Sequence, residues 1–146
     1  MIELRYPAIS PRTRQGAQGS EVFDPVRKRW VNLSPEEWVR QQFVLLLTET
    51  HQYPMALMAT ERSIELGPLQ KRIDLLVYDR SQQPWMLIEC KAETVTLNNS
   101  VLEQLLRYNM SVPCRYLLIT NGIVCWGWER DAQALHPIEK LPVYPV

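Results

Sequence analysis

The sequence predicts an α/β fold in which helices flank a mixed β-sheet. Three observations support this prediction. A capped helix begins at residue 34, three β-favouring segments lie between residues 58 and 93, and a second helical segment precedes two short strands. The order is therefore helix, three strands, helix, two strands. This alternation is typical of an α/β sandwich, here with a central mixed sheet of about four or five strands.

The first helix has a strong start signal. Ser34 suits the N-cap, Pro35 suits the first helical position, and Glu37 completes a capping box with the serine. We expect this helix to continue to about residue 49. Its apolar side chains recur at helical spacing and form a stripe that should pack on the sheet, namely Val39, Phe43, Leu46 and Leu47.

Three strands are expected after this helix. Residues 58–66 alternate moderately between polar and apolar side chains, and Gly67-Pro68 then turns the chain. Residues 71–79 form the second predicted strand and residues 85–93 the third, joined by a polar turn that contains proline. The apolar centre of the third strand predicts burial on both of its faces.

A second helix and two further strands complete the predicted core. The helix is capped within residues 98–100 and extends to about residue 110. Residues 115–120 and 123–128 then form two strands that are joined at Asn121-Gly122, a typical tight turn.

The chain divides into three parts on this interpretation. Residues 1–33 form an N-terminal arm with a short hairpin, residues 34–130 form the core, and residues 131–146 form a tail that is rich in proline and need not be ordered. Residues 1–29 carry six basic and three acidic side chains. This mild bias favours a solvated arm over a DNA clamp.

Composition limits the classes of function. The 146 residues carry 16 basic and 16 acidic side chains, so binding to nucleic acid by bulk basicity is excluded and any such binding requires a local site. Zero net charge is also compatible with self-association. The longest apolar run, residues 43–47, is too short to cross a membrane. Three cysteines without a C-x-x-C pair indicate a reducing compartment, and we expect a cytoplasmic protein.

One group of residues carries chemistry. Asp74 lies on the second predicted strand, and Glu89 and Lys91 lie two residues apart on the third, so these two share a face. If the two strands pair, Asp74 lies beside Glu89. Two carboxylates and a main-chain carbonyl such as that of Cys90 are oxygen ligands that suit Mg²⁺ or Mn²⁺. A neighbouring lysine can orient or deprotonate a water and stabilise charge on a phosphate.

An alternative interpretation is a surface ion pair between Lys91 and Glu89 or Asp74. Such pairs are common and contribute about 0–1 kcal/mol, and the spacing alone favours this alternative. The setting argues for a site, because apolar residues 75–77 and 86–88 lead directly into these charges. Charges at the ends of buried strands are costly unless something binds them.

The same residues resemble a known family. Arg72-Ile-Asp-Leu-Leu-Val and Pro84-Trp-Met-Leu-Ile-Glu-Cys-Lys-Ala resemble the PD-(D/E)xK nuclease core. They resemble more closely the nuclease domain at the N-terminus of type I restriction enzyme R subunits. The resemblance covers residues 34–128, including residues 36–41, 104–108 and 119–122.

This resemblance implies a restriction-endonuclease-like sandwich. It also implies that Asp74 and Glu89 bind the metal and that Lys91 is the catalytic lysine. Ile73 stands where the wider superfamily usually has proline, whereas the R-subunit group commonly has Arg-x-Asp, as this sequence has from Arg72 to Asp74.

The first helix offers two acids for a supporting role. Glu37 is well explained by the capping box. Glu36 lies three residues before Val39, which places it on the stripe that faces the sheet. The glutamate of the resembling family lies four residues before an arginine, which matches Glu36 and Arg40. We select Glu36 as the supporting acid, and Glu37 remains the alternative.

Four further residues are candidates for contact with DNA. Gln104 and Tyr108 share one face of the second helix, and the resemblance implies that such a pair borders the active site and positions DNA or the catalytic lysine. The alternative is that Tyr108 belongs to the core and Gln104 is exposed. Arg72 and Arg40 suit phosphate contacts or are solvated charges, and Arg72 shares the face of Asp74.

The leading hypothesis is a Mg²⁺- or Mn²⁺-dependent deoxyribonuclease that acts alone, as a homodimer, or with a motor or specificity subunit in trans. The first alternative is a non-catalytic DNA-binding module that keeps the nuclease fold. The second is a homodimeric interaction module, in which Trp126 and Trp128 share a face that would serve as the contact surface.

Overall fold

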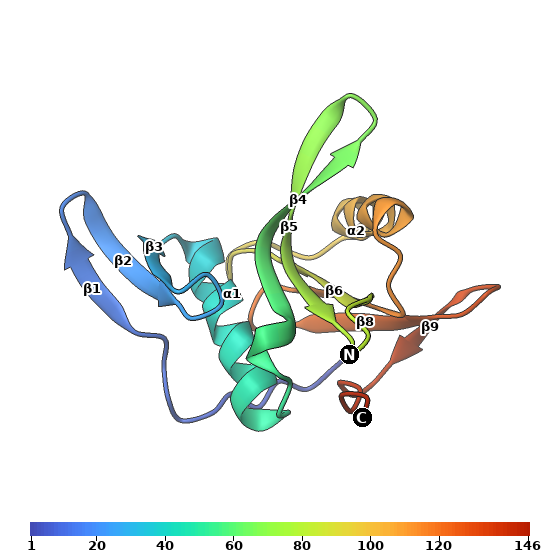
Figure 1. The fold of residues 1–146 in the computed structure, drawn as a ribbon, viewed down its shortest axis with the longest axis horizontal. Helices are drawn as coiled ribbons and strands as arrows, with labels where there is room; N and C mark the ends of the chain where they lie inside the picture. The colour runs from blue at the N-terminus through green and yellow to red at the C-terminus, as the bar shows by residue number, and fades with distance from the viewer.

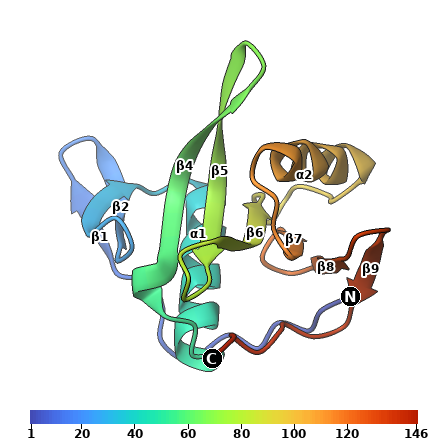
Figure 2. The same ribbon diagram turned by 45° about the vertical axis from the view of Figure 1, so that its right-hand side comes forward.

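The computed structural model describes residues 1–146, apart from the side chain of Leu66. A six-stranded mixed sheet forms its centre, with one helix on each face and a smaller three-stranded sheet beside the first helix (Figure 1). The distal end of the β4–β5 hairpin projects beyond the rest of the molecule, and the first and last segments of the chain run alongside each other on one side (Figure 2).

Two helices cover the central sheet. The first, α1 (Pro35–Leu45), begins as predicted, because the Ser34 hydroxyl accepts the Glu37 amide at 3.0 Å. One π-helical turn, η1 (Leu46–Thr50), extends it, and the 3-10 turn η2 (Met55–Leu57) follows. The second helix, α2 (Asn99–Ser111), is capped by the Asn98 side chain, which accepts the Ser100 amide at 3.0 Å.

The central sheet has the order β4-β5-β6-β7-β8-β9. All neighbouring strands are antiparallel except β6 and β7, which are parallel because α2 crosses between them. The strands are β4 (Met58–Leu66), β5 (Leu69–Tyr78), β6 (Pro84–Cys90), β7 (Tyr116–Thr120), β8 (Cys125–Arg130) and β9 (Leu135–Ile138).

Each face of this sheet has its own core. On one face, Val39 and Phe43 of α1 share a core with the sheet residues Leu75, Val77, Met86 and Ile88. On the other face, Val101 and Leu105 of α2 share a core with the sheet residues Leu76, Leu87 and Leu117. The predicted α/β class, with a mixed sheet and two helices, is therefore confirmed, and β6 is buried on both faces as expected.

The strand count differs from the prediction because residues 131–146 are ordered. They contribute the edge strand β9, in which proline is tolerated since one side of an edge strand needs no hydrogen bonds. Beyond β9, Leu141 and Tyr144 are buried, and the Tyr144 hydroxyl donates to the Tyr78 carbonyl at 2.6 Å. Apolar side chains thus dock this segment, although its prolines suggested an unordered tail.

Residues 1–33 are also more ordered than an arm with a hairpin. They form an antiparallel sheet of β1 (Thr13–Gly16), β2 (Gly19–Asp24) and β3 (Arg29–Asn32). The predicted hairpin is β2–β3, and a turn at Gly16–Gly19 adds the third strand. Before it, the Ile2 amide donates to the Cys125 carbonyl at 2.9 Å, so the chain start joins the main core.

The β7–β8 turn requires glycine for two reasons. Gly122 has a φ of 90°, and a Cβ at this position would lie 3.2 Å from the Val39 side chain. The Asn121 side chain accepts the amides of Ile123 and Val124, which closes the turn. This turn therefore packs closely against the start of α1. Among the described residues, no helix is both long and apolar enough to cross a membrane.

Candidate active site

The candidate carboxylates lie on adjacent strands. β5 and β6 pair as predicted with Leu75 opposite Ile88, so Asp74 and Glu89 are the next positions along the two strands. Asp74 Oδ2 accepts the Cys90 amide at 2.8 Å. Both carboxylates are buried, with exposed fractions of 6% for Asp74 and 3% for Glu89. A surface ion pair, the alternative interpretation of the spacing, does not describe this burial.

Burial makes both carboxylates costly to ionise. Burial raises the pKa of Glu89, and the neighbouring charge of Asp74 raises it further. Burial also raises the pKa of Asp74, although the Arg40 charge and the Cys90 amide oppose that rise. Ionisation of the pair is therefore costly in the metal-free protein, and a bound cation would offset that cost.

One oxygen of the pair has no partner. Glu89 Oε2 is buried and makes no hydrogen bond among the described residues. Unpaired buried oxygens are rare because they lose their hydration without compensation. Among the same residues, no cluster of three or more His, Cys, Asp or Glu side chains has the arrangement of a metal site. Mg²⁺ keeps several of its waters and needs only one or two carboxylates, so two acids and the Cys90 carbonyl suit it.

The predicted strand 85–93 ends earlier, at Cys90, so Lys91 follows β6 instead of lying on it, and its side chain lies beside Glu89. Its Nζ is 3.5 Å from Glu89 Oε1 and 3.5 Å from Gln104 Oε1. Gln104 Nε2 in turn donates to the Tyr108 hydroxyl at 2.7 Å. Tyr108 is buried in the core against α2, so this residue is a core residue and also a partner of Gln104. The helix thus holds the amide that contacts the lysine.

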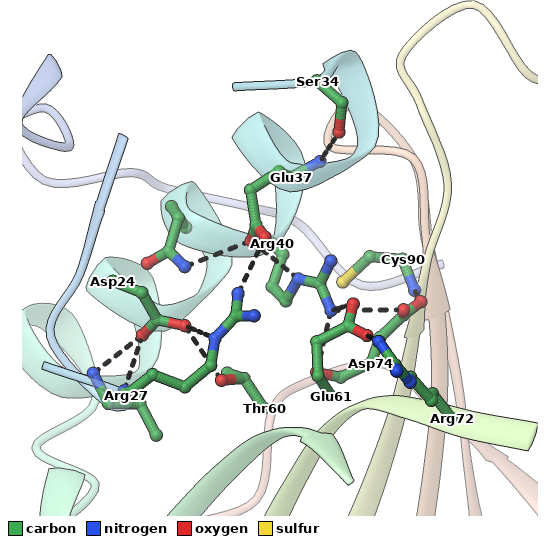
Figure 3. A network of polar contacts seen from close by, with 12 residues as sticks. Asp24, Arg27, Ser34, Glu37, Arg40, Thr60, Glu61, Arg72, Asp74 and Cys90 are labelled. Atoms are coloured by element: carbon green, nitrogen blue, oxygen red, sulfur yellow. Dashed lines mark hydrogen bonds and ion pairs between the residues drawn. The ribbon is translucent and has the colours of Figure 1, made fainter. Parts of the chain in front are cut away.

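The two acids of α1 point in different directions. The Glu37 carboxylate accepts hydrogen bonds from Arg27, Arg40 and Gln41 (Figure 3). Glu36 is half-buried, and its charge contributes to the raised pKa values of both Asp74 and Glu89. The chain therefore brings Glu36 near the carboxylates, and the role assigned to it stays a prediction.

The two candidate arginines differ in exposure. The Arg40 side chain is 5% exposed and contacts Glu37, Glu61 and Asp74, so it faces carboxylates and not the solvent (Figure 3). The Arg72 side chain is 70% exposed, and its Nη1 lies 3.4 Å from Glu61 Oε2. Of the two, Arg72 is accessible to a DNA phosphate.

Residues 35–142 match the family model of the type I restriction enzyme R protein N terminus. The chain belongs to this family. The matched segment contains all the candidate site residues and extends from the start of α1 beyond β9, which confirms the resemblance suggested by the motifs. A search of curated proteins finds no match. Membership connects this R-protein N-terminal domain with a nuclease-related role.

Sequence reasoning did not identify Glu61 as part of the site. In the R-protein N-terminal domain, Thr60 pairs with Leu75 and Arg62 with Ile73, so Glu61 lies opposite Asp74 on β4. The turn at Gly67-Pro68 was the feature of the sequence that could have placed Glu61 beside Asp74. Once that turn fixes the register of the hairpin, Glu61 is level with Asp74, which is next to Glu89 on β6, although the ladder is interrupted at Glu61, where φ is 56°.

Proposed function

We propose that this domain is a metal-dependent deoxyribonuclease that hydrolyses phosphodiester bonds of DNA with Mg²⁺ or Mn²⁺. One observation carries the proposal. Asp74 in the middle of β5 lies beside Glu89 near the end of β6 and close to Lys91, and among the described residues Glu89 Oε2 has no hydrogen-bond partner. This is the arrangement that a cation-dependent phosphodiester site needs, and it is costly for a purely structural one.

The donor set supports a divalent cation. Asp74, Glu89 and the Cys90 carbonyl would hold it through oxygen atoms, which Mg²⁺ and Mn²⁺ prefer. When bound, such an ion neutralises charge on the phosphate and lowers the pKa of a bound water. Glu36 would support the site as the additional acid of α1.

The remaining residues would position the attacking water, the lysine amine and the DNA backbone. Lys91 would orient the attacking water and stabilise charge that develops on the phosphate. Gln104 restrains the lysine amine, and Tyr108 restrains the Gln104 amide. Arg72 would contact a neighbouring phosphate, because its guanidinium is exposed on the same strand as Asp74.

The proposed partner is DNA. The domain acts alone, as a homodimer, or with a motor or specificity subunit in trans, consistent with the restriction enzymes of its family. A specific observation favours the alternative of an interaction module. Trp126 is 43% exposed and lines a hollow of about 260 Å³ with Trp128 and the start of α2. A surface tryptophan beside a hollow suits contact with a protein.

Cleavage of supercoiled and linear DNA with Mg²⁺ or Mn²⁺ tests the proposed function. The comparison is between the wild type, Lys91→Ala and the control Lys71→Ala, which changes an exposed lysine of β5. We expect Lys91→Ala to lose at least about a hundredfold in rate with its fold retained, as removal of one charge-stabilising group does. Lys71→Ala should cleave like the wild type.

Equal cleavage by all three proteins would contradict the assigned site. Absence of cleavage by the wild type, together with absence of Mn²⁺ binding, would favour the interaction module.

A further inference from the structure

Arg40 is a buried cation surrounded by carboxylates. Its Nε donates to Glu37 Oε2 at 2.8 Å, and its Nη1 pairs with Glu61 and lies 3.4 Å from both Asp74 Oδ1 and the Asp74 carbonyl. The side chain is 5% exposed. One guanidinium thus pairs with three carboxylates, one each from α1, β4 and β5 (Figure 3).

Other cations share two of these acids. Glu37 also accepts from Arg27 Nη2 at 2.8 Å, and Glu61 lies 3.4 Å from Arg72. Asp74 differs from them. Its Oδ2 is occupied by the neutral Cys90 amide, and among the described residues Arg40 is the cation within salt-bridge distance of its carboxylate.

The candidate metal ligand therefore already has a positive charge beside it. We propose that Arg40 is a positioning residue and built-in counter-ion of the metal site, which holds Asp74 in the metal-free protein and weakens metal binding by competing for that carboxylate. This inference rests on the proposed function, since it takes Asp74 as a metal ligand.

Arg40 cannot simply move away when a metal arrives. Glu37 anchors its Nε and Glu61 its Nη1, and the side chain is enclosed. A divalent ion on Asp74 would then lie close to a fixed guanidinium, and repulsion between like charges in a poorly solvated site is substantial. Removal of the guanidinium should strengthen metal binding. In the metal-free protein the same removal leaves Glu37, Glu61 and Asp74 without their shared cation, which should lower stability.

Opposite changes in two measurements test this inference. Calorimetric titration gives the Mn²⁺ dissociation constant, and urea unfolding without metal gives stability, for the wild type and Arg40→Met. We expect Arg40→Met to bind Mn²⁺ about tenfold more tightly, the equivalent of about 1.4 kcal/mol, and to be less stable without metal. Arg40→Lys, which keeps the charge, should bind Mn²⁺ like the wild type.

Arg27→Met is the matched control, because Arg27 is a largely buried arginine of the same network that contacts Asp24 and Glu37 but not Asp74. It should lose stability without any gain in Mn²⁺ affinity. If Arg40→Met does not fold, Glu61→Gln serves instead. It frees Arg40 to pair more strongly with Asp74 and should weaken Mn²⁺ binding several-fold.

Unchanged or weaker Mn²⁺ binding by folded Arg40→Met would overturn the inference and leave the nuclease proposal standing, as would unchanged or tighter binding by Glu61→Gln. Failure of the proposed function is distinguishable, because Asp74→Ala would then bind Mn²⁺ no differently from the wild type.

Discussion

Two groups of buried charged residues meet at Arg40 and differ in how well their charges are paired. On one side, fully buried Asp24 accepts hydrogen bonds from the amides of Val26 and Arg27, from the Arg27 guanidinium and from the Thr60 hydroxyl. On the other side, Glu89 Oε1 lies 3.5 Å from the Lys91 amine, and Glu89 Oε2 has no hydrogen-bond partner among the described residues.

This difference separates a structural cluster from a candidate site. The Asp24 cluster joins β2, α1 and β4, and its polar groups are satisfied, so it needs no ligand. The carboxylates of Asp74 on β5 and Glu89 on β6 are buried with fewer hydrogen-bond donors, and the pKa of each is raised. A fold retains such an arrangement at a stability cost, and perturbed groups of this kind concentrate at functional sites.

The largest effect on stability is expected from disrupting the Asp24 cluster, whose polar groups are all hydrogen-bonded. Asp24→Ala leaves the Arg27 guanidinium and the Thr60 hydroxyl without their partner, and removal of one member of a buried pair costs about 3–5 kcal/mol. Urea unfolding measures this loss. The control Arg14→Ala breaks an exposed pair with Glu21 and should cost less than about 1 kcal/mol. Equal losses for the two variants would show that the Asp24 cluster is not structural.

The opposite result is expected at the candidate site. Glu89→Gln replaces a carboxyl group whose ionisation is disfavoured by burial and by Asp74, so the metal-free protein should gain about 1 kcal/mol or more in stability at pH 7. DNA cleavage and metal-dependent stabilisation should both be lost. Urea unfolding with and without Mn²⁺ measures both the gain in metal-free stability and the loss of stabilisation by the metal. A large loss of stability in the metal-free variant would mean that Glu89 is a structural residue.

The two clusters should also respond to pH in opposite directions. Burial alone would raise the pKa of Asp24, but hydrogen bonds from Arg27 and Thr60 outweigh it and the pKa is lowered. Its stabilisation is therefore present above the ordinary pKa of aspartate, about 4, and is lost as pH falls through the lowered value.

The pH dependence of stability that Glu89 causes has the opposite sign, because its pKa is raised. Its contribution to stability is complete below the ordinary pKa of glutamate and is lost as pH rises from that value through the raised pKa of the folded protein. The stability advantage of Glu89→Gln over the metal-free wild type should thus grow from about pH 4.5 towards neutrality, whereas Asp24→Asn should approach the wild type in acid. Unfolding free energies measured across pH 3–8 test both signs, and parallel curves would contradict the assignment.

The smallest effect is expected from the contacts that restrain Lys91. Tyr108→Phe removes the hydroxyl that accepts from Gln104 and keeps the ring in its core, so stability should change by less than about 1 kcal/mol. The turnover number for DNA should fall several-fold because the amide that contacts the lysine is less restrained. Steady-state cleavage kinetics measure this, and Tyr144→Phe, which loses a hydroxyl contact far along the chain, is a control that should keep its turnover.

Much of this architecture was accessible from the sequence. Ser34, Pro35 and Glu37 predict the start of α1 because capping is a local interaction. The alternation of residues along β5 and β6 and the turn between them predict that Asp74 lies beside Glu89. Local signals of this kind do not depend on the rest of the fold.

The missed features depend on tertiary contacts. Proline-rich residues 131–146 contain no strong strand signal, and β9 forms because β8 offers a free edge and the core accepts Tyr144. Arg40 carries no mark in the sequence that distinguishes a DNA contact from a buried counter-ion. That distinction requires Glu61, which reaches the site only when the register of the β4–β5 hairpin is known.

The central claim is that the carboxylate pair on β5 and β6 binds a divalent cation, and calorimetric titration of Mn²⁺ into the wild type and Glu89→Gln tests it most directly. The account predicts a saturable site in the wild type that is abolished or weakened at least about tenfold in the folded variant, the equivalent of about 1.4 kcal/mol. Equal Mn²⁺ binding by the two proteins would contradict it.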